Sequence, residues 1–110
     1  MPEQVRFDPD SPVMTLVLND PDRRNALSAG LFDQLERSLD VAGELIDSKS
    51  SHVLRIRGEG PAFCAGFDLE AMADGALPSF LERLGAICRR LRHLDAVVVA
   101  EVHGPALAGG

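Results

Sequence analysis

The chain has 110 residues, of which 45% are hydrophobic and 25% charged, a balance that is ordinary for one globular domain with a modest core. Its formal net charge of -6 argues against a groove for nucleic acid and, more weakly, against a surface for anionic membranes. The acidic, proline-containing N-terminus is not typical of a secretory signal, and no apolar run approaches the ~20 residues that span a bilayer. We therefore expect a cytoplasmic protein without nucleic-acid or membrane partners.

The N-terminal half predicts a hairpin followed by one long helix. Residues 5–7 and 13–18 are short β-prone runs, and the prolines and acids between them favour a turn. Ser28 is a suitable N-cap for a helix that reaches about Asp47. Apolar residues recur at helical spacing along this segment, at Leu31, Leu35, Leu39, Ala42, Leu45 and Ile46. One such stripe is typical of a helix that packs on a sheet.

The second half repeats this alternation of strand and helix. Residues 53–56 and 96–102 are apolar, β-rich runs, and a short helix is expected over residues 69–73. A second long helix is expected to begin at Pro78, with an apolar stripe made of Phe80, Leu81, Leu84, Ile87, Cys88 and Leu91. The order of strand, helix, strand, helix and strand predicts an α/β structure with crossover connections.

The two cysteines, Cys64 and Cys88, do not indicate a redox or metal function. They lie far apart, without a C-x-x-C motif and without a histidine at ligand spacing. This arrangement predicts neither a disulfide framework nor a metal site.

Two loops of small residues follow the last two predicted strands. The first contains Ala62, Cys64, Ala65 and Gly66, and the second runs over residues 103–110 and ends in two glycines. Small side chains let a ligand oxygen approach the main chain, and N–H groups that open a helix have no internal partners. Two such loops can aim two backbone N–H groups at one carbonyl oxygen, which is the geometry of an oxyanion hole.

Three segments together resemble the enoyl-CoA hydratase/isomerase (crotonase) family in order and spacing. They are Asn19-x-Pro21 with Asn25-Ala26-Leu27-Ser28, then Gly60-Pro61-Ala62-Phe63-Cys64-Ala65-Gly66-Phe67-Asp68-Leu69, then Val102-His103-Gly104-Pro105-Ala106-Leu107-Ala108-Gly109-Gly110. The resemblance implies a crotonase/ClpP-like fold of repeated β-β-α units. Residues 1–110 are then expected to be the N-terminal part of one such domain, incomplete after the second loop. Ala108 stands where many relatives carry the first of three glycines.

The resemblance also implies which residues form the site. By residue matching, the two donors of the oxyanion hole are the main-chain N–H groups of Ala65 and Gly109. Substrate contacts are expected from Arg24, Ala26, Ala65, Gly66, Phe67, Asp68, Leu69 and Gly109. Because coenzyme A is part of the acyl-CoA substrate, no separate cofactor and no metal ion are expected. Family members assemble as trimers or pairs of trimers, so the parent protein is expected to be a homo-trimer or hexamer.

Several of these residues also have simpler interpretations. Taken alone, the Ala65 corner is equally typical of a tight turn, and a loop arginine such as Arg24 is more commonly a solvated surface residue. Cys64 is better explained as a small group in a crowded turn than as a nucleophile. A histidine at a strand end, such as His103, is more often structural than a base, and Asp68 is more often a helix cap than a catalytic acid.

Three functions remain open from the sequence. The first is an enoyl-CoA hydratase or isomerase of fatty acid metabolism, which stabilises a thioester enolate. Hydration also needs a positioned acid and base, which the family carries after the second loop, so this chain is expected to be inactive alone. The second is another acyl-CoA reaction, such as decarboxylation, dehalogenation or thioester hydrolysis. The third is a non-catalytic truncated remnant that binds acyl-CoA weakly or docks on a partner through exposed apolar surface.

Overall fold

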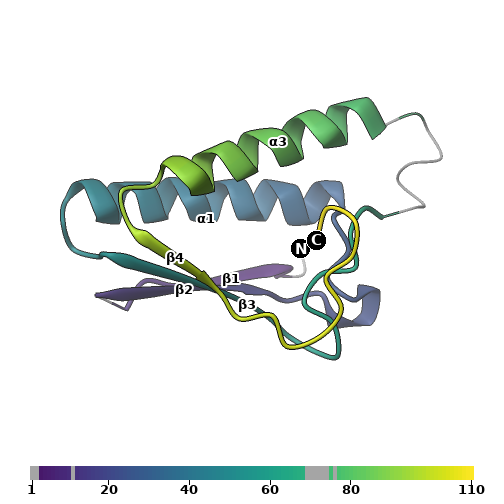
Figure 1. Ribbon diagram of the computed structural model, residues 1–110, viewed down its shortest axis with the longest axis horizontal. Helices are drawn as coiled ribbons and strands as arrows, with labels where there is room; N and C mark the ends of the chain where they lie inside the picture. Colours follow the sequence, from purple (N-terminus) through teal and green to yellow (C-terminus); the bar gives the residue numbers. More distant parts are fainter. Residues whose placement is uncertain (1–2, 11, 69–74, 76) are drawn as a thin grey trace.

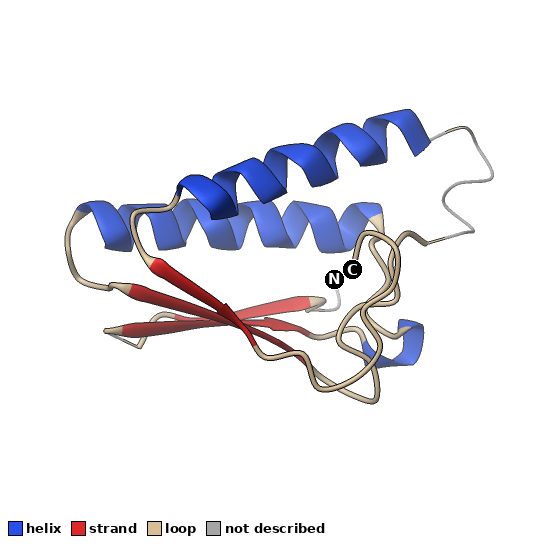
Figure 2. Ribbon diagram, in the orientation of Figure 1, coloured by secondary structure: helices blue, strands red, loops and turns tan. Residues whose placement is uncertain are grey.

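The computed structural model describes residues 3–10, 12–68, 75 and 77–110, which build one sheet and two long helices (Figure 1). The strands β1 (Val5–Asp8), β2 (Val13–Leu18), β3 (Val53–Gly58) and β4 (Val97–Ala100) lie in the order β1-β2-β3-β4. The helices α1 (Ala29–Asp47) and α3 (Leu77–His93) lie on the same side of this sheet (Figure 2). A short 3-10 helix, η1 (Pro21–Arg23), follows β2.

The sheet combines one antiparallel and two parallel pairings. β1 pairs antiparallel with β2, which confirms the predicted hairpin. β2 pairs parallel with β3, and β3 pairs parallel with β4, so α1 and α3 are the crossover helices. β3 runs two residues beyond the predicted 53–56, whereas β4 is shorter than the predicted 96–102. The helix expected over residues 69–73 lies outside the described residues.

The helix α1 forms where its apolar stripe and its cap predict it. The Ser28 hydroxyl accepts a hydrogen bond from the N–H of Leu31 at 3.2 Å, which satisfies one of the unpaired donors at the helix start. The buried side chains of α1 are Leu31, Phe32, Leu35, Ser38, Leu39, Ala42 and Ile46. The apolar side chains among them pack in the core with the sheet residues Met14, Leu16, Leu18 and Leu54.

The helix α3 buries less of its apolar stripe than the periodicity predicts. Phe80 and Ile87 are buried, but Leu81 is 51% exposed and Cys88 is also exposed, so these two residues were wrongly placed in the core stripe. The reason is that the face of α3 that packs on α1 contains both apolar and charged side chains. The ring of Phe80 meets the ring of Phe32 edge-on, with 5.3 Å between centroids.

Arginine side chains complete the contact between the two helices. Arg83 lies over the Phe32 ring, 5.1 Å from its centroid, and its guanidinium pairs with Asp33 and Glu36. Further along, Arg90 pairs with Asp40 at 2.6 Å. Charged side chains therefore form part of the interface between α1 and α3, where a continuous apolar stripe was predicted.

The arrangement of the strands brings three loops to one end of the sheet. Because β2, β3 and β4 are parallel, their C-terminal ends lie at the same edge, and the segments that follow them gather there (Figure 1). This edge is where open α/β sheets commonly bind ligands. Within the described ranges, neither helix is both long enough and apolar enough to cross a membrane.

Candidate functional site

The two loops of small residues are joined directly to one another. Cys64 and Ala106 form an isolated parallel bridge, in which the N–H of Cys64 donates to Pro105 at 3.2 Å and the N–H of Leu107 donates to Cys64 at 3.0 Å. Gly66 has a φ of +90°, and a Cβ atom there would lie 2.6 Å from the carbonyl oxygen of Leu107. Glycine at this position therefore permits the close approach of the two loops.

A third segment, residues 24–27, lies against the first loop. The N–H of Leu27 donates to Gly66 at 2.7 Å, and the N–H of Asp68 donates to Leu27 at 3.2 Å. These bonds make Leu27 and Phe67 an isolated parallel bridge. All three motif segments of the sequence therefore meet at one place.

The N–H of Ala65 is already engaged in this junction. It donates to the carbonyl oxygen of Arg24 at 2.9 Å, a distance typical of a good amide hydrogen bond. The donor that the sequence analysis assigned to a ligand oxygen therefore holds the first loop to residues 24–27. A ligand oxygen would have to displace Arg24 to reach it.

Two other amides of the loops are without a main-chain acceptor. Among the backbone hydrogen bonds of the described loops, none has the N–H of Phe67 or of Gly109 as its donor. Both residues are partly exposed. They are also neighbours, since a Cβ atom on Gly109 would lie 3.6 Å from the Phe67 ring. In the parallel bridge with Leu27, the flanking Gly66 and Asp68 supply the hydrogen-bonding groups, which leaves the Phe67 amide directed away from that segment.

The side chain of Asn25 is a site feature that the sequence analysis did not single out. It is fully buried and accepts a hydrogen bond from the N–H of Asp20 at 2.7 Å. Its amide nitrogen lies 3.1, 3.1 and 3.0 Å from the carbonyl oxygens of Glu59, Ala62 and Phe63. An asparagine directly after two arginines in a turn was the available signal, but three of its four partners lie more than 30 residues away in the sequence.

The predicted substrate-binding residues occupy different environments. Arg24 is exposed and lines a cavity of about 310 Å³ beside the first loop, together with Pro61, Ala62, Ala65, Pro105 and Leu107. Ala26 is buried. Asp68 pairs with Arg23 at 3.3 Å, and this ion pair links Arg23 to the first loop. Leu69 lies outside the described residues.

Cys64 and His103 have structural contacts. The Cys64 thiol is buried and donates to the carbonyl oxygen of Asn25 at 3.1 Å. Burial raises the pKa of this thiol above its ordinary value, while a backbone hydrogen bond with Gly66 acts in the opposite direction. A neutral buried thiol is a poor nucleophile. His103 donates from Nε2 to the carbonyl oxygen of Gly60 at 2.7 Å, which links the second loop to the first.

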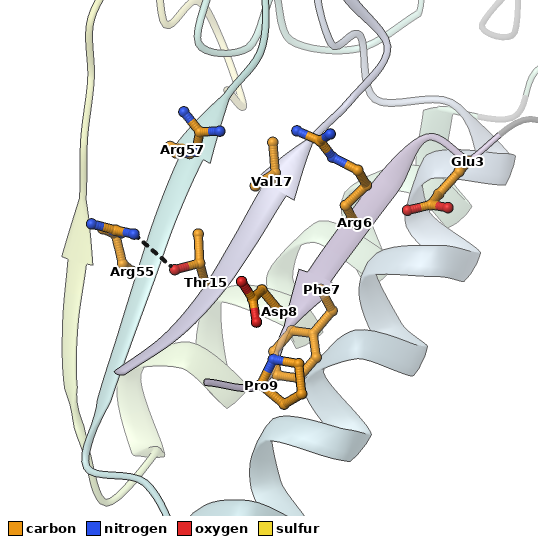
Figure 3. A pocket seen from close by; sticks show the side chains of 9 residues that line it. All are labelled: Glu3, Arg6, Phe7, Asp8, Pro9, Thr15, Val17, Arg55 and Arg57. Atoms are coloured by element: carbon orange, nitrogen blue, oxygen red, sulfur yellow. Dashed lines mark hydrogen bonds between the residues drawn. The ribbon is translucent and has the colours of Figure 1, made fainter. Parts of the chain in front are cut away.

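A larger cavity, of about 500 Å³, lies away from these loops on the face of the sheet opposite the helices (Figure 3). Its arginines are paired with neighbouring groups: Arg6 and Arg57 share Glu59, at 2.7 and 2.9 Å, and Arg55 contacts Thr15 at 3.1 Å. Paired side chains of this kind are typical of the solvated face of a sheet. We therefore locate the candidate site at the loops.

Comparisons with known proteins identify the family of this chain. The family described as Enoyl-CoA hydratase/isomerase matches residues 9–110, which include all three motif segments. A probable enoyl-CoA hydratase of Mycobacterium leprae is 34% identical over 98 residues, covering 89% of this chain and 39% of the relative. An enoyl-CoA isomerase/hydratase of Mycosarcoma maydis is 35% identical over 106 residues, with the same two coverages.

Solved structures show the same fold. The enoyl-CoA hydratase of Bacillus anthracis superimposes with a TM-score of 0.86 and 26% identity, covering 97% of this chain and 42% of that structure. AtuE of Pseudomonas aeruginosa gives a TM-score of 0.86 and 29% identity, covering 98% of this chain and 43% of that structure. The chain thus spans about two fifths of the length of these proteins.

Proposed function

Because the chain belongs to the enoyl-CoA hydratase/isomerase family, we propose that it binds an acyl-CoA thioester at the three joined loops and polarises the thioester carbonyl through two main-chain N–H groups. The parent protein would then be an enoyl-CoA hydratase or isomerase. Since the chain spans only about two fifths of its relatives, we assign it the binding and polarising steps and place no acid or base on its residues. The fatty-acid pathway, the cytoplasmic location and the trimeric or hexameric assembly stay predictions.

The observation that carries this proposal is the pair of unengaged amides in adjoining loops. Negative charge collects on the thioester oxygen when the substrate passes through an enolate. Two fixed N–H donors stabilise that charge with little reorganisation, and the loss of one typically slows such a reaction by about 100-fold to 1000-fold. The N–H groups of Phe67 and Gly109 fit this role because no main-chain acceptor competes for them among the described loops.

We propose Phe67 in place of Ala65 as the donor from the first loop. The Ala65 amide bonds to Arg24, and breaking this bond for each substrate would cost part of the binding energy. Gly109 is kept as the donor from the second loop. Ala65 keeps a role in lining the cavity beside Arg24.

Arg24 is the proposed contact for the phosphate groups of coenzyme A. Its side chain borders the cavity next to the loops, and a guanidinium fits phosphate geometry well. Among the described residues its side chain forms no ion pair, in contrast to that of Arg23, which pairs with Asp68.

The test is a titration of the uniformly ¹⁵N-labelled protein with a short 2-enoyl-CoA, followed by NMR. We expect the amide resonances of Phe67 and Gly109 to shift, and that of Ala65 to change little. Free coenzyme A, which has no thioester carbonyl, should not produce the two shifts. Ala65 shifting in place of Phe67 would restore the first assignment, and no binding at millimolar ligand would refute the proposal.

A pair of arginine variants tests the phosphate contact. Arg24→Ala should weaken acyl-CoA binding about tenfold, since it removes a charge-assisted contact. The matched control is Arg37→Ala, because Arg37 is exposed on α1, away from the loops, and should leave the affinity unchanged. Equal affinities of the two variants in calorimetric titration would remove Arg24 from the site.

A non-catalytic binding role is the second candidate, and the pairing of the loop carboxylates favours it. Asp68 pairs with Arg23, and Glu59 pairs with Arg6 and Arg57, so each of these carboxylates is engaged by an arginine. A carboxylate held by an arginine is less free to reach a substrate proton, which a general base must do. Loss of the enoyl absorbance when the chain binds the enoyl-CoA would exclude this second role.

A further inference from the structure

The buried amide of Asn25 connects two loops that are separate in the sequence. Its oxygen accepts from the N–H of Asp20 at 2.7 Å, and its nitrogen lies within 3.1 Å of three carbonyl oxygens at residues 59, 62 and 63. A primary amide has two N–H donors, so they are shared among the three acceptors. With 0% exposure, the side chain has no water to replace these bonds if they are lost.

The backbone at this position adds a second constraint. Arg24 and Asn25 have φ values of +54° and +56°, two consecutive residues in the left-handed region. Asparagine tolerates this conformation better than most residues, whereas arginine does not. The turn therefore depends on contacts outside itself, and the buried amide of Asn25 supplies them.

The same turn fixes the first loop of the site from the other side. The carbonyl oxygen of Arg24 accepts the N–H of Ala65 at 2.9 Å, and the carbonyl oxygen of Asn25 accepts the thiol of Cys64 at 3.1 Å. With the amide of Asn25 on residues 59–63 and its neighbouring carbonyls on residues 64 and 65, the turn holds the loop along its length. Phe67 follows this stretch directly.

We propose that Asn25 is a positioning residue of the acyl-CoA site, which sets the direction of the Phe67 N–H by holding residues 59–65 against the turn. This inference rests on the proposed function for its consequence in binding. Its structural part, that one buried amide controls the opening of the first loop, stands on the contacts alone. Replacing a residue that only adds global stability would instead accelerate hydrogen exchange throughout the molecule to the same degree.

The test uses Asn25→Gly, which removes the side chain but keeps a residue suited to positive φ. We expect hydrogen exchange at the Ala65 amide to accelerate at least tenfold more than at the buried Leu39 amide in α1. Thiol labelling gives a second readout, because Cys64 is buried and Cys88 is exposed on α3. The labelling of Cys64 should accelerate at least tenfold, while that of Cys88 stays the same.

Two further variants separate this effect from other causes. Asn19→Gly is the matched control, since among the described residues the side chain of Asn19 bonds to the carbonyl oxygen of Glu3, at 2.9 Å and outside the turn. Gly58→Ala leaves Asn25 in place but would put a Cβ atom 2.7 Å from the carbonyl oxygen of Phe63 and 3.0 Å from the Asn25 amide nitrogen. It should reproduce the effect, and it decides the question if Asn25→Gly does not fold.

The outcomes keep the two proposals apart. The positioning role would be overturned if hydrogen exchange accelerated equally at the Ala65 and Leu39 amides in both Asn25→Gly and Gly58→Ala. It would also be overturned if the labelling rate of Cys64 were unchanged. If that role holds, affinity for a short 2-enoyl-CoA should fall at least tenfold in Asn25→Gly and stay unchanged in Asn19→Gly. Failure of the unaltered protein to bind enoyl-CoA would refute the proposed function, while the exchange and labelling results would still decide the role of Asn25.

Discussion

Replacing Ala108 by glycine should stabilise the protein, although glycine usually destabilises an ordered chain. Ala108 has a φ of +49°, in the left-handed region where a Cβ atom is crowded by its own backbone. Its side chain is exposed, so its removal uncovers no core surface. The position lies directly before Gly109, one of the two proposed donors.

The magnitude follows from two opposing terms. The left-handed conformation costs an L-residue about 1–2 kcal/mol, which glycine does not pay. Glycine in turn gives the unfolded chain more freedom, which costs about 0.4–1 kcal/mol. The difference is a gain of roughly 0.5–1 kcal/mol, or an increase in the melting temperature of about 2–5 °C for a chain of this size.

Thermal and urea unfolding of Ala108→Gly and of Ala106→Gly measure this gain. Ala106 is an exposed residue of the same loop and is not among the residues with positive φ, so it gains no relief from the same chemical change. We expect opposite signs, with Ala108→Gly more stable and Ala106→Gly less stable than the unaltered protein. A loss of stability in both variants would refute the argument from backbone strain.

Three further predictions concern other parts of the fold. Gly66→Ala should destabilise the protein by at least ~2 kcal/mol and abolish acyl-CoA binding, because its φ is +90° and its new Cβ would meet a carbonyl oxygen at 2.6 Å. Gly43→Ala in α1 is its control, and it should stabilise by about 1 kcal/mol because nothing lies within 4 Å of the new Cβ. Ser28→Ala should cost about 1 kcal/mol in urea unfolding, through loss of the helix cap. The raised pKa of Cys64 means that the folded state holds its thiol proton more tightly than the unfolded state, so stability should fall as pH rises above the ordinary thiol pKa, and less so in Cys64→Ala.

Each of these predictions has a clear contrary result. Wild-type affinity in Gly66→Ala would mean that the two loops need not approach closely. An unchanged unfolding midpoint for Ser28→Ala would show that the cap bond is offset by water. The same pH dependence with and without Cys64 would assign the loss of stability to other groups.

The order of the elements could be predicted because it depends on local pattern. The apolar spacing from Leu31 to Ile46 defines α1, and Ser28 marks its start as expected. The β-prone runs at residues 5–7, 13–18 and 53–56 each lie within a strand of the sheet. Periodicity is a property of residues that are close in the sequence, so it can be recognised without knowledge of the rest of the fold.

What the sequence could not show depends on groups that meet only in space. The apolar stripe of α3 was predicted to be continuous, but Leu81 is exposed because the helix packs on α1 through arginine and phenylalanine side chains. The choice between Ala65 and Phe67 as donor rests on a hydrogen bond to Arg24, which is 41 residues from Ala65 in the chain. A sequence motif indicates which residues lie at the site. It does not indicate the direction of each backbone N–H group, because that direction depends on the turn that packs against the loop.

The side of β4 that faces away from β3 bears on how this chain behaves in concentrated solution, because none of the described strands pairs with it. Val97, Val98 and Val99 are 62%, 36% and 43% exposed on a strand that ends the sheet. Consecutive valines with free backbone groups are the surface on which strands of separate molecules add to one another. We therefore expect solubility to fall with rising concentration, and Val99→Lys, on the same face as the exposed Arg55, to act as a gatekeeper that keeps the chain monodisperse at the levels NMR requires.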